Sequence, residues 1–248
     1  MNTPHTTSAR EQHEGAAWGR RVGTGLVVAS AVYVVAASMM GLVFASSPPP
    51  RLLEGMYDFE QGRALYQWGF VGASLLAPAF VSIVLLLAAA AGVPPSSVRR
   101  STAGVLLGAY VAFATLAYTS QYTFFPDLVD RDPTIAAQWY FHDVESIPYA
   151  IDLAGYALLG AAALLLASLL AEHGRRWLAG WLTGMGALSI AAFVLYAAGT
   201  GPLAGIVSLT SAVMSLPIAT LAFLQGRTLR ADGTRPGPQD GCTARSPV

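Results

Sequence analysis

The chain contains no lysine, a single cysteine and only four histidines in 248 residues. One cysteine excludes a disulfide framework within the chain, a thiolate metal cluster and paired-cysteine redox chemistry. Charged residues make up only 11% of the sequence and hydrophobic residues 54%, which is too apolar for a soluble domain with an ordinary charged surface. The missing lysines indicate a GC-rich genome, and we expect a bacterial protein.

Long charge-free runs occupy most of the sequence. A helix needs about 20 apolar residues to cross the roughly 30 Å hydrocarbon layer of a membrane. Four runs supply one span each, and a fifth supplies two because a turn rich in glycine and proline at residues 199–202 divides it. We therefore predict an all-α integral membrane protein with a six-transmembrane-helix bundle at residues 20–228. The predicted spans are 22–46, 66–91, 102–125, 148–171, 177–198 and 203–225.

Positive charge is concentrated on one side of this topology. Eleven of the fourteen arginines lie in the two tails and in the second and fourth connections, whereas the other side has three arginines and nine acidic residues. The positive-inside rule then places both termini in the cytoplasm and predicts a bacterial cytoplasmic (inner or plasma) membrane protein. This charge separation indicates a fixed orientation of the protein in a lipid bilayer, and it gives no support to nucleic-acid binding. Residues 1–19 and 229–248 are expected to form disordered cytoplasmic tails.

A motif of the form RRxxAGxLxG opens the third span at Arg99 and the fifth span at Arg175. A weaker version at Arg20 opens the first span, so the bundle is consistent with three repeated helical hairpins of one ancestral type. The alternative is that paired arginines at each inward start reflect topology alone.

Small residues and prolines within the spans predict local helix geometry. Two glycine pairs, Gly104 with Gly108 and Gly180 with Gly184, have the spacing that lets helices approach closely in lipid. Pro78 is expected to kink the second span, and Pro217 likewise the sixth. The sequence shows no sign of a helix broken at the membrane midplane, which argues against a transporter. Three serines in the sixth span are expected to form hydrogen bonds between helices, and they are Ser208, Ser211 and Ser215.

Two short segments resemble a bacterial family of polytopic membrane proteins of unknown function. They are RWLAGW at residues 176–181 and YTSQY at residues 118–122. The resemblance covers most of the helical part of the chain, from about residue 20 to residue 226. It implies a multi-pass membrane protein, and the family has no established activity or catalytic residues to transfer.

Both longer outer connections are expected to contain short surface helices. Asp132 followed by Pro133 is typical of a helix start, and the predicted helix continues to Ser146. Its aromatic residues, 139–141, suit the headgroup layer, with His142 and Glu145 on the wetter side. In the first connection, apolar side chains at Leu52, Met56 and Phe59 alternate with acidic residues and predict a shorter surface helix.

The candidate site lies where the third connection enters the fourth span. His142, Glu145, Tyr149 and Asp152 are spaced three, four and three residues apart, which aligns them on one helical face unless Pro148 breaks the helix. We expect an outward-facing polar-aromatic pocket there. The residues predicted to line it are Asp152, Glu145, His142, Tyr149, Tyr156, Tyr118, Gln121 and Tyr122.

Asp152 is the only ionisable residue predicted to lie within a span. Such residues cost about 2.5–3.5 kcal/mol at the bilayer centre and are therefore functional candidates. Asp152 is also near the start of a helix, where the helix dipole stabilises a carboxylate by about 0.3–1 kcal/mol, so a structural role stays open. A metal site at His142 and Glu145 is not favoured because no metal-binding spacing is present, and we expect no cofactor.

Three classes of function remain open. The first is a pocket that binds or passes a small amphipathic or cationic molecule, since carboxylates and tyrosine faces suit a cation. The second is an intramembrane enzyme acting on a lipid or isoprenoid, with Asp152 or Glu145 as the general acid. The third is a structural or regulatory protein that acts through a protein partner. The expected partners are thus the lipid bilayer and either a small hydrophobic or cationic ligand or an unidentified protein.

Overall fold

The structure, a computed structural model, describes residues 9–46 and 56–232 and is all-helical within them. Six of its apolar segments, each 22 to 32 residues long, are long enough to cross a membrane. The prediction of an all-helical chain with six long apolar helices is confirmed, and these helices fit a multi-pass membrane protein. The helices are α1 (Ala9–Ser46), α2 (Met56–Ala73), α3 (Leu76–Ala90), α4 (Val98–Tyr122), α5 (Phe125–Arg131), α6 (Pro133–Gln138), α7 (Ile147–Glu172), α8 (Arg176–Ala197) and α9 (Gly201–Asp232).

The first and last helices extend beyond the predicted spans. Helix α1 begins at Ala9, so residues 9–19, which the sequence places in a disordered tail, are helical, and α9 continues to Asp232. Residues 9–19 include alanine, glutamate, glutamine and arginine, which are good helix formers and allow the helix to continue past the apolar run. The remaining parts of both predicted tails, 1–8 and 233–248, lie outside the described residues.

The second span consists of two helices, α2 and α3, separated by a turn at Ser74 and Leu75. Pro78 has no backbone N–H and cannot bond to the carbonyl of Ser74, which explains the interruption. The turn lies near the middle of the Arg63–Ala90 span, so the expectation that no helix is broken at this depth is wrong.

The short surface helix predicted for the first connection is not a separate element. Residues 56–60 are the start of α2, and Leu52 lies outside the described residues. Helix α9 continues through Pro217.

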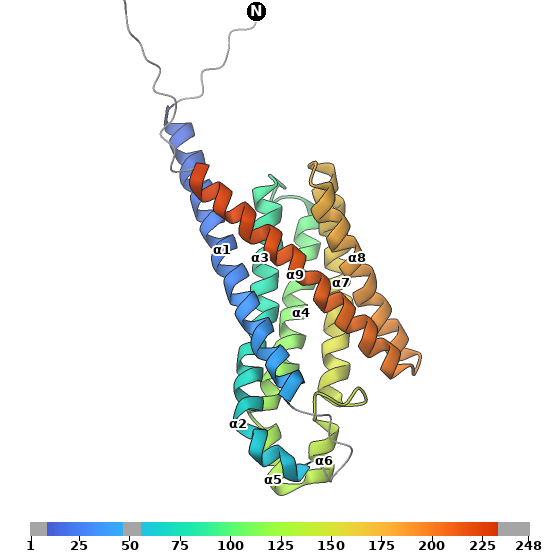
Figure 1. The fold of residues 1–248 in the computed structure, drawn as a ribbon. Coiled ribbons are helices and arrows are strands. Elements are labelled where there is room, and N and C mark those ends of the chain that lie inside the picture. Colours follow the sequence, from blue (N-terminus) through green and yellow to red (C-terminus); the bar gives the residue numbers. More distant parts are fainter. Residues whose placement is uncertain (1–8, 47–55, 233–248) are drawn as a thin grey trace, which may run out of the picture.

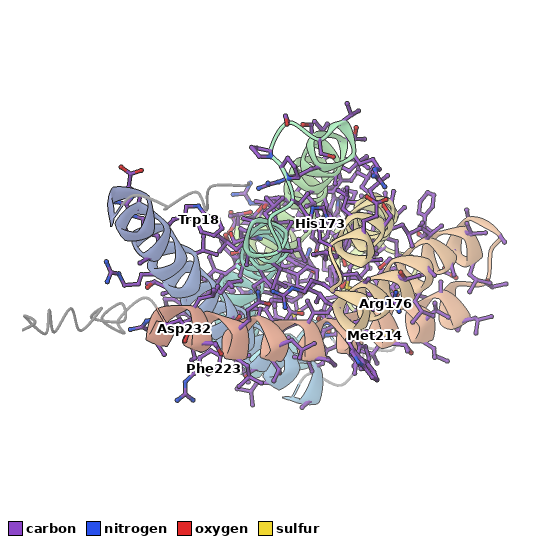
Figure 2. All side chains as sticks on the ribbon, turned by 90° about the horizontal axis from the view of Figure 1, so that it is seen from above. Trp18, His173, Arg176, Met214, Phe223 and Asp232 are labelled. Carbon is purple, nitrogen blue, oxygen red and sulfur yellow. The ribbon has the colours of Figure 1, made fainter. Side chains whose placement is uncertain are left out.

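The six long apolar segments alternate in direction, which brings the start of α1 and the end of α9 to the same end of the bundle (Figure 1). We call this the basic end, because the α3–α4 and α7–α8 connections with their paired arginines also lie there. Figure 2 looks onto it, with Trp18, His173 and Arg176 labelled. Helix α9 starts at the opposite end beside α8 and runs obliquely across one face to α1 (Figure 1).

Glycines allow α7 to pack closely against α8, and α1 against α9. These glycines are not the ones in the RRxxAGxLxG motifs, which were predicted to do so. A Cβ atom added to Gly160 of α7 would lie 2.6 Å from the carbonyl oxygen of Gly186 in α8. Gly23 in α1 and Gly226 in α9 face each other in the same way, with a corresponding distance of 2.7 Å. By contrast, a Cβ at Gly104, Gly108 or Gly180 would meet nothing within 4 Å, and one at Gly184 would meet only the Met214 side chain. The predicted close packing at the Gly104 and Gly180 motifs is therefore wrong in this chain.

Residues 125–146, which we call the cap segment, cover the other end of the bundle (Figure 1). The predicted helix start is confirmed, because the Asp132 side chain accepts hydrogen bonds from the N–H groups of Thr134 and Ile135. The helix nevertheless ends at Gln138, and residues 139–146 form turns. Tyr140 and Phe141 are buried in the core, so their predicted place in the headgroup layer is wrong.

The cap segment is also tied to α2 by an ion pair between Arg63 and Asp130. The two guanidinium nitrogens donate to the two carboxylate oxygens, at 3.1 and 2.5 Å. These hydrogen bonds from Arg63 lower the pKa of Asp130. The pair keeps α5 against the beginning of the second span.

Candidate functional site

The start of α7 decides which candidate residues share a helical face. Ser146 is the N-cap, and its hydroxyl accepts a hydrogen bond from the N–H of Tyr149, while Pro148 occupies the first turn. Tyr149 and Asp152 therefore lie on one face of α7, and Tyr156 follows one turn further along. His142 and Glu145 precede the helix, so the predicted alignment of all four residues on one face is wrong.

Asp152 is buried, with 6% of its surface exposed. The hydroxyl of Tyr118 in α4 donates a hydrogen bond to Oδ2 of Asp152 at 3.4 Å. Oδ1 is buried without a hydrogen-bond partner in the part of the chain that the structure describes. No described arginine or histidine forms an ion pair with this carboxyl group. The aspartate thus has unused capacity to accept a hydrogen bond or to pair with a cation.

Tyrosines from three helices surround this carboxyl group and extend toward the bundle centre. The hydroxyls of Tyr110 in α4, and of Tyr149 and Tyr156 in α7, lie within electrostatic range of Asp152. The rings of Tyr110 and Tyr156 meet edge to face, 6.1 Å apart. Tyr33 of α1 interacts with both of them electrostatically. We call Tyr33, Tyr110, Tyr118, Tyr149 and Tyr156 the tyrosine cluster.

The tyrosine cluster is held on its far side by α9. The Tyr33 and Ser215 hydroxyls are hydrogen-bonded, and Tyr149 is similarly bonded to Ser208 at 3.2 Å. Ser211, between them, is bonded to Ser189 of α8 at 2.7 Å. The predicted hydrogen bonding between helices by the three serines is confirmed. These bonds connect α9 to α1, α7 and α8.

Gln121 belongs to a separate, fully paired network beneath the cap segment. Its side-chain oxygen accepts hydrogen bonds from the hydroxyl of Tyr66 at 2.6 Å and from the backbone N–H of Phe141 at 3.2 Å. Its amide nitrogen donates to the hydroxyl of Ser120 at 2.7 Å. Gln121 therefore anchors the cap segment to α2 and α4, and Tyr122 beside it is half-buried against the same core.

His142 lies in an aromatic box instead of on the wetter side of a helix. Its imidazole packs against Phe44 at 4.5 Å, Tyr140 at 5.1 Å, Tyr66 at 5.8 Å and Phe70 at 6.2 Å, measured between ring centroids. Both ring nitrogens are buried and have no hydrogen-bond partner among the described residues. This burial lowers the pKa of His142 from 6.5 to about 4. The predicted wet location of His142 is wrong.

The Phe70 ring contacts both His142 and Tyr118, so an aromatic ring lies between the box around His142 and the hydrogen-bond partner of Asp152. Phe141 packs against Tyr118 with ring centroids 5.3 Å apart, and Phe70 packs against Tyr118 at 6.2 Å. Glu145 is exposed, and its backbone N–H donates to the carboxylate of Asp143. The structure therefore brings together Asp152, Tyr118, Tyr149 and Tyr156 from the predicted site.

Tyr33, Tyr110 and Ser215 were not in the predicted site, although each contributes to it. Tyr33 and Ser215 are 182 residues apart in the sequence, and no local pattern connects them. A tyrosine inside an apolar span was a usable signal for Tyr33 and Tyr110, because a buried tyrosine hydroxyl needs a polar partner.

The chemistry of the site is that of a single carboxyl group surrounded by aromatic hydroxyls. No group of three histidine, cysteine or acidic residues that could hold a metal occurs in the described ranges.

Comparison of the chain with models of protein families, with curated proteins and with solved structures gave no match. The assignment of function consequently depends on the geometry around Asp152.

Proposed function

We propose that the protein binds, and can pass, a small cationic or amphipathic molecule at Asp152 and the tyrosine cluster. The observation that carries this proposal is the Asp152 carboxyl group, which is 6% exposed, has one unpartnered oxygen and is surrounded by tyrosines. An ionised carboxyl group in such a place is destabilised by several kcal/mol when it has no partner. A cationic ligand would supply that partner.

The tyrosine rings add a second contribution to the same recognition. A cation over an aromatic face gains about 0.5–1 kcal/mol at exposed sites and about 2 kcal/mol when it is desolvated. Tyr110 and Tyr156 meet edge to face, and Tyr118 donates to the carboxyl group itself. A ligand with an apolar body and one positive charge fits this combination better than a strongly hydrated inorganic cation.

The proposal that the molecule is passed through the bundle is supported by two features of the helices. The α2–α3 turn interrupts the second span near its middle, and such interruptions accompany substrate sites in transporters. Phe70, one turn before that interruption, packs against Tyr118 of the site. A movement of α2 relative to α3 would thus reach the residues around Asp152.

We further propose that the basic end faces the cytoplasm of a bacterial cell and that the cap segment faces outward, at the membrane surface. This orientation is supported by the paired arginines at the basic end and by the acidic residues of the cap segment. Two exposed tryptophans suit the two interfacial layers of the membrane. Trp18 lies near the basic end, and Trp68 lies near the beginning of the second span. Three ancestral hairpins remain the proposed origin of the bundle.

The proposal is tested by mass spectrometry of the full chain purified in mild detergent. We expect a defined cationic or amphipathic molecule to be retained by the wild type and lost from Asp152→Asn. Glu145→Gln is the matched control, because it neutralises an exposed carboxylate near the start of the same helix. Equal retention by Asp152→Asn and the wild type, at equal expression, would overturn the proposal. A stoichiometric protein partner or a neutral isoprenoid in place of the cation would also contradict it.

A further inference from the structure

We propose that the basic end carries a separate site for the headgroup of an anionic phospholipid, formed on α8 by Arg175, Arg176, Trp177, Gly180 and Trp181. The site is independent of Asp152 and lies at the opposite end of the bundle. It rests on a groove, on two unpaired arginines and on an exposed tryptophan.

The groove is a surface depression of about 270 Å³ lined by Arg176, Trp177, Gly180 and Trp181. These residues are spaced so that Trp177 and Trp181 lie one turn apart on α8, and Arg176 and Gly180 likewise. A Cβ atom at Gly180 would meet nothing within 4 Å, so the glycine leaves open space next to the two indole rings. A single helix therefore supplies the groove with one charged residue, two aromatic residues and the open space at Gly180.

Arg175 and Arg176 differ from the Arg99–Arg100 pair of the α3–α4 connection. Arg99 forms two hydrogen bonds with the Glu172 carboxylate, at 2.7 and 2.8 Å, and Arg100 donates to the carbonyl of Val93. Arg175 and Arg176 make no ion pair or side-chain hydrogen bond within the described residues. Their positive charge is available to an anion from outside the chain.

The two copies of the RRxxAGxLxG motif provide an internal comparison. Position for position, Trp177 and Trp181 replace Ser101 and Val105 of the first copy. The copy whose arginines are paired within the protein lacks tryptophans, and the copy whose arginines are unpaired has both. A Cβ atom at Gly180 would meet nothing within 4 Å, so packing within the chain does not account for the small residue.

A phospholipid is the occupant that this combination favours. Trp177 is 86% exposed, which suits an indole ring in the interfacial layer of a membrane. Arginine pairs well with phosphate oxygens, and basic residues at a membrane surface each contribute about 1 kcal/mol of attraction to anionic lipids. The groove then accommodates the glycerol region of the lipid between the tryptophans, with the phosphate at the two arginines.

The test is native mass spectrometry of the full chain titrated with phosphatidylglycerol and, separately, with phosphatidylcholine. For the double variant Arg175→Gln/Arg176→Gln we expect roughly 30-fold weaker retention of phosphatidylglycerol. The matched control is Arg227→Gln/Arg230→Gln, which removes the same charge from the basic end but leaves the groove intact. Its loss of retention should be clearly smaller, because neither Arg227 nor Arg230 lines the groove.

A third variant distinguishes the contribution of the groove to lipid binding from the contribution of the arginine charge. Gly180→Leu fills the open space, keeps both arginines and should weaken phosphatidylglycerol retention to a similar extent without lowering the thermal stability of the protein. Equal losses in the two double variants would show a general effect of net charge and overturn the proposal. Unchanged retention in Gly180→Leu, equal retention of phosphatidylcholine, or displacement of the lipid by free glycerol phosphate at equal concentration would overturn it as well.

Discussion

The aromatic box around His142 predicts a loss of stability in mild acid. The neutral imidazole is held among Phe44, Tyr66, Phe70 and Tyr140, and neither ring nitrogen has a partner among the described residues. The two tyrosines ionise far above neutral pH, so the histidine is the group in this box that changes charge between pH 4 and 7. Acidification therefore acts on the box through His142.

The size of the effect follows from the two pKa values of His142. In the unfolded chain the pKa is close to 6.5, whereas burial lowers it to about 4 in the folded protein. Above pH 6.5 both states are neutral and stability does not change. Between pH 6.5 and 4 the unfolded state binds a proton that the folded state does not, so stability falls with pH. Each pKa unit corresponds to 1.36 kcal/mol, and the loss is about 3 kcal/mol at pH 4.

The assay is equilibrium unfolding in mixed micelles at several pH values between 7 and 4, with the wild type compared with His142→Phe. Phenylalanine keeps an aromatic ring in the box and removes both buried nitrogens, so the variant should lack the His142 part of the pH dependence. His173→Gln is the control, because it removes an exposed histidine that lies outside the box, and its loss of stability between pH 7 and 4 should match that of the wild type. Identical pH profiles for the wild type and His142→Phe would refute this reasoning.

Two further predictions concern packing and the paired network under the cap segment. Gly160→Ala should destabilise the bundle by about 1–3 kcal/mol, because its Cβ would collide with the backbone of α8, whereas Gly104→Ala should have little effect; thermal unfolding of both variants measures the difference. An equal effect of the two substitutions would contradict the α7–α8 contact. Gln121→Ala should cost about 2–4 kcal/mol, because it removes the oxygen that accepts hydrogen bonds from the Tyr66 hydroxyl and the Phe141 N–H, and hydrogen exchange at Phe141 should rise. Unchanged exchange at that amide would contradict the network.

The features that the sequence predicted well depend on neighbouring residues. The length of the apolar runs determines the six long helices, because each run must cover the same hydrocarbon thickness. Asp132 followed by Pro133 defines a helix start through contacts within three residues. The face shared by Asp152 and Tyr156 follows from helix periodicity alone.

The features that the sequence did not predict depend on packing between distant segments. The hydrogen bond between Tyr33 and Ser215 requires α9 to cross the bundle to α1, and the spacing of residues along either helix does not contain that crossing. His142 was expected in water because histidine is polar, yet the short α6 turns the chain back and buries the ring among residues of α1 and α2. The close contact of Gly160 with Gly186 likewise lies outside the repeated motif.

The central claim is that Asp152 recognises a positive charge inside the bundle. A binding titration of the purified chain with tetraphenylphosphonium, an apolar cation, tests it most directly. We expect one probe molecule per chain, binding roughly 30-fold weaker to Asp152→Asn, since loss of a buried charge partner costs about 2 kcal/mol or more, and unchanged binding to Glu145→Gln. Equal affinity of the wild type and Asp152→Asn for the probe would contradict the account.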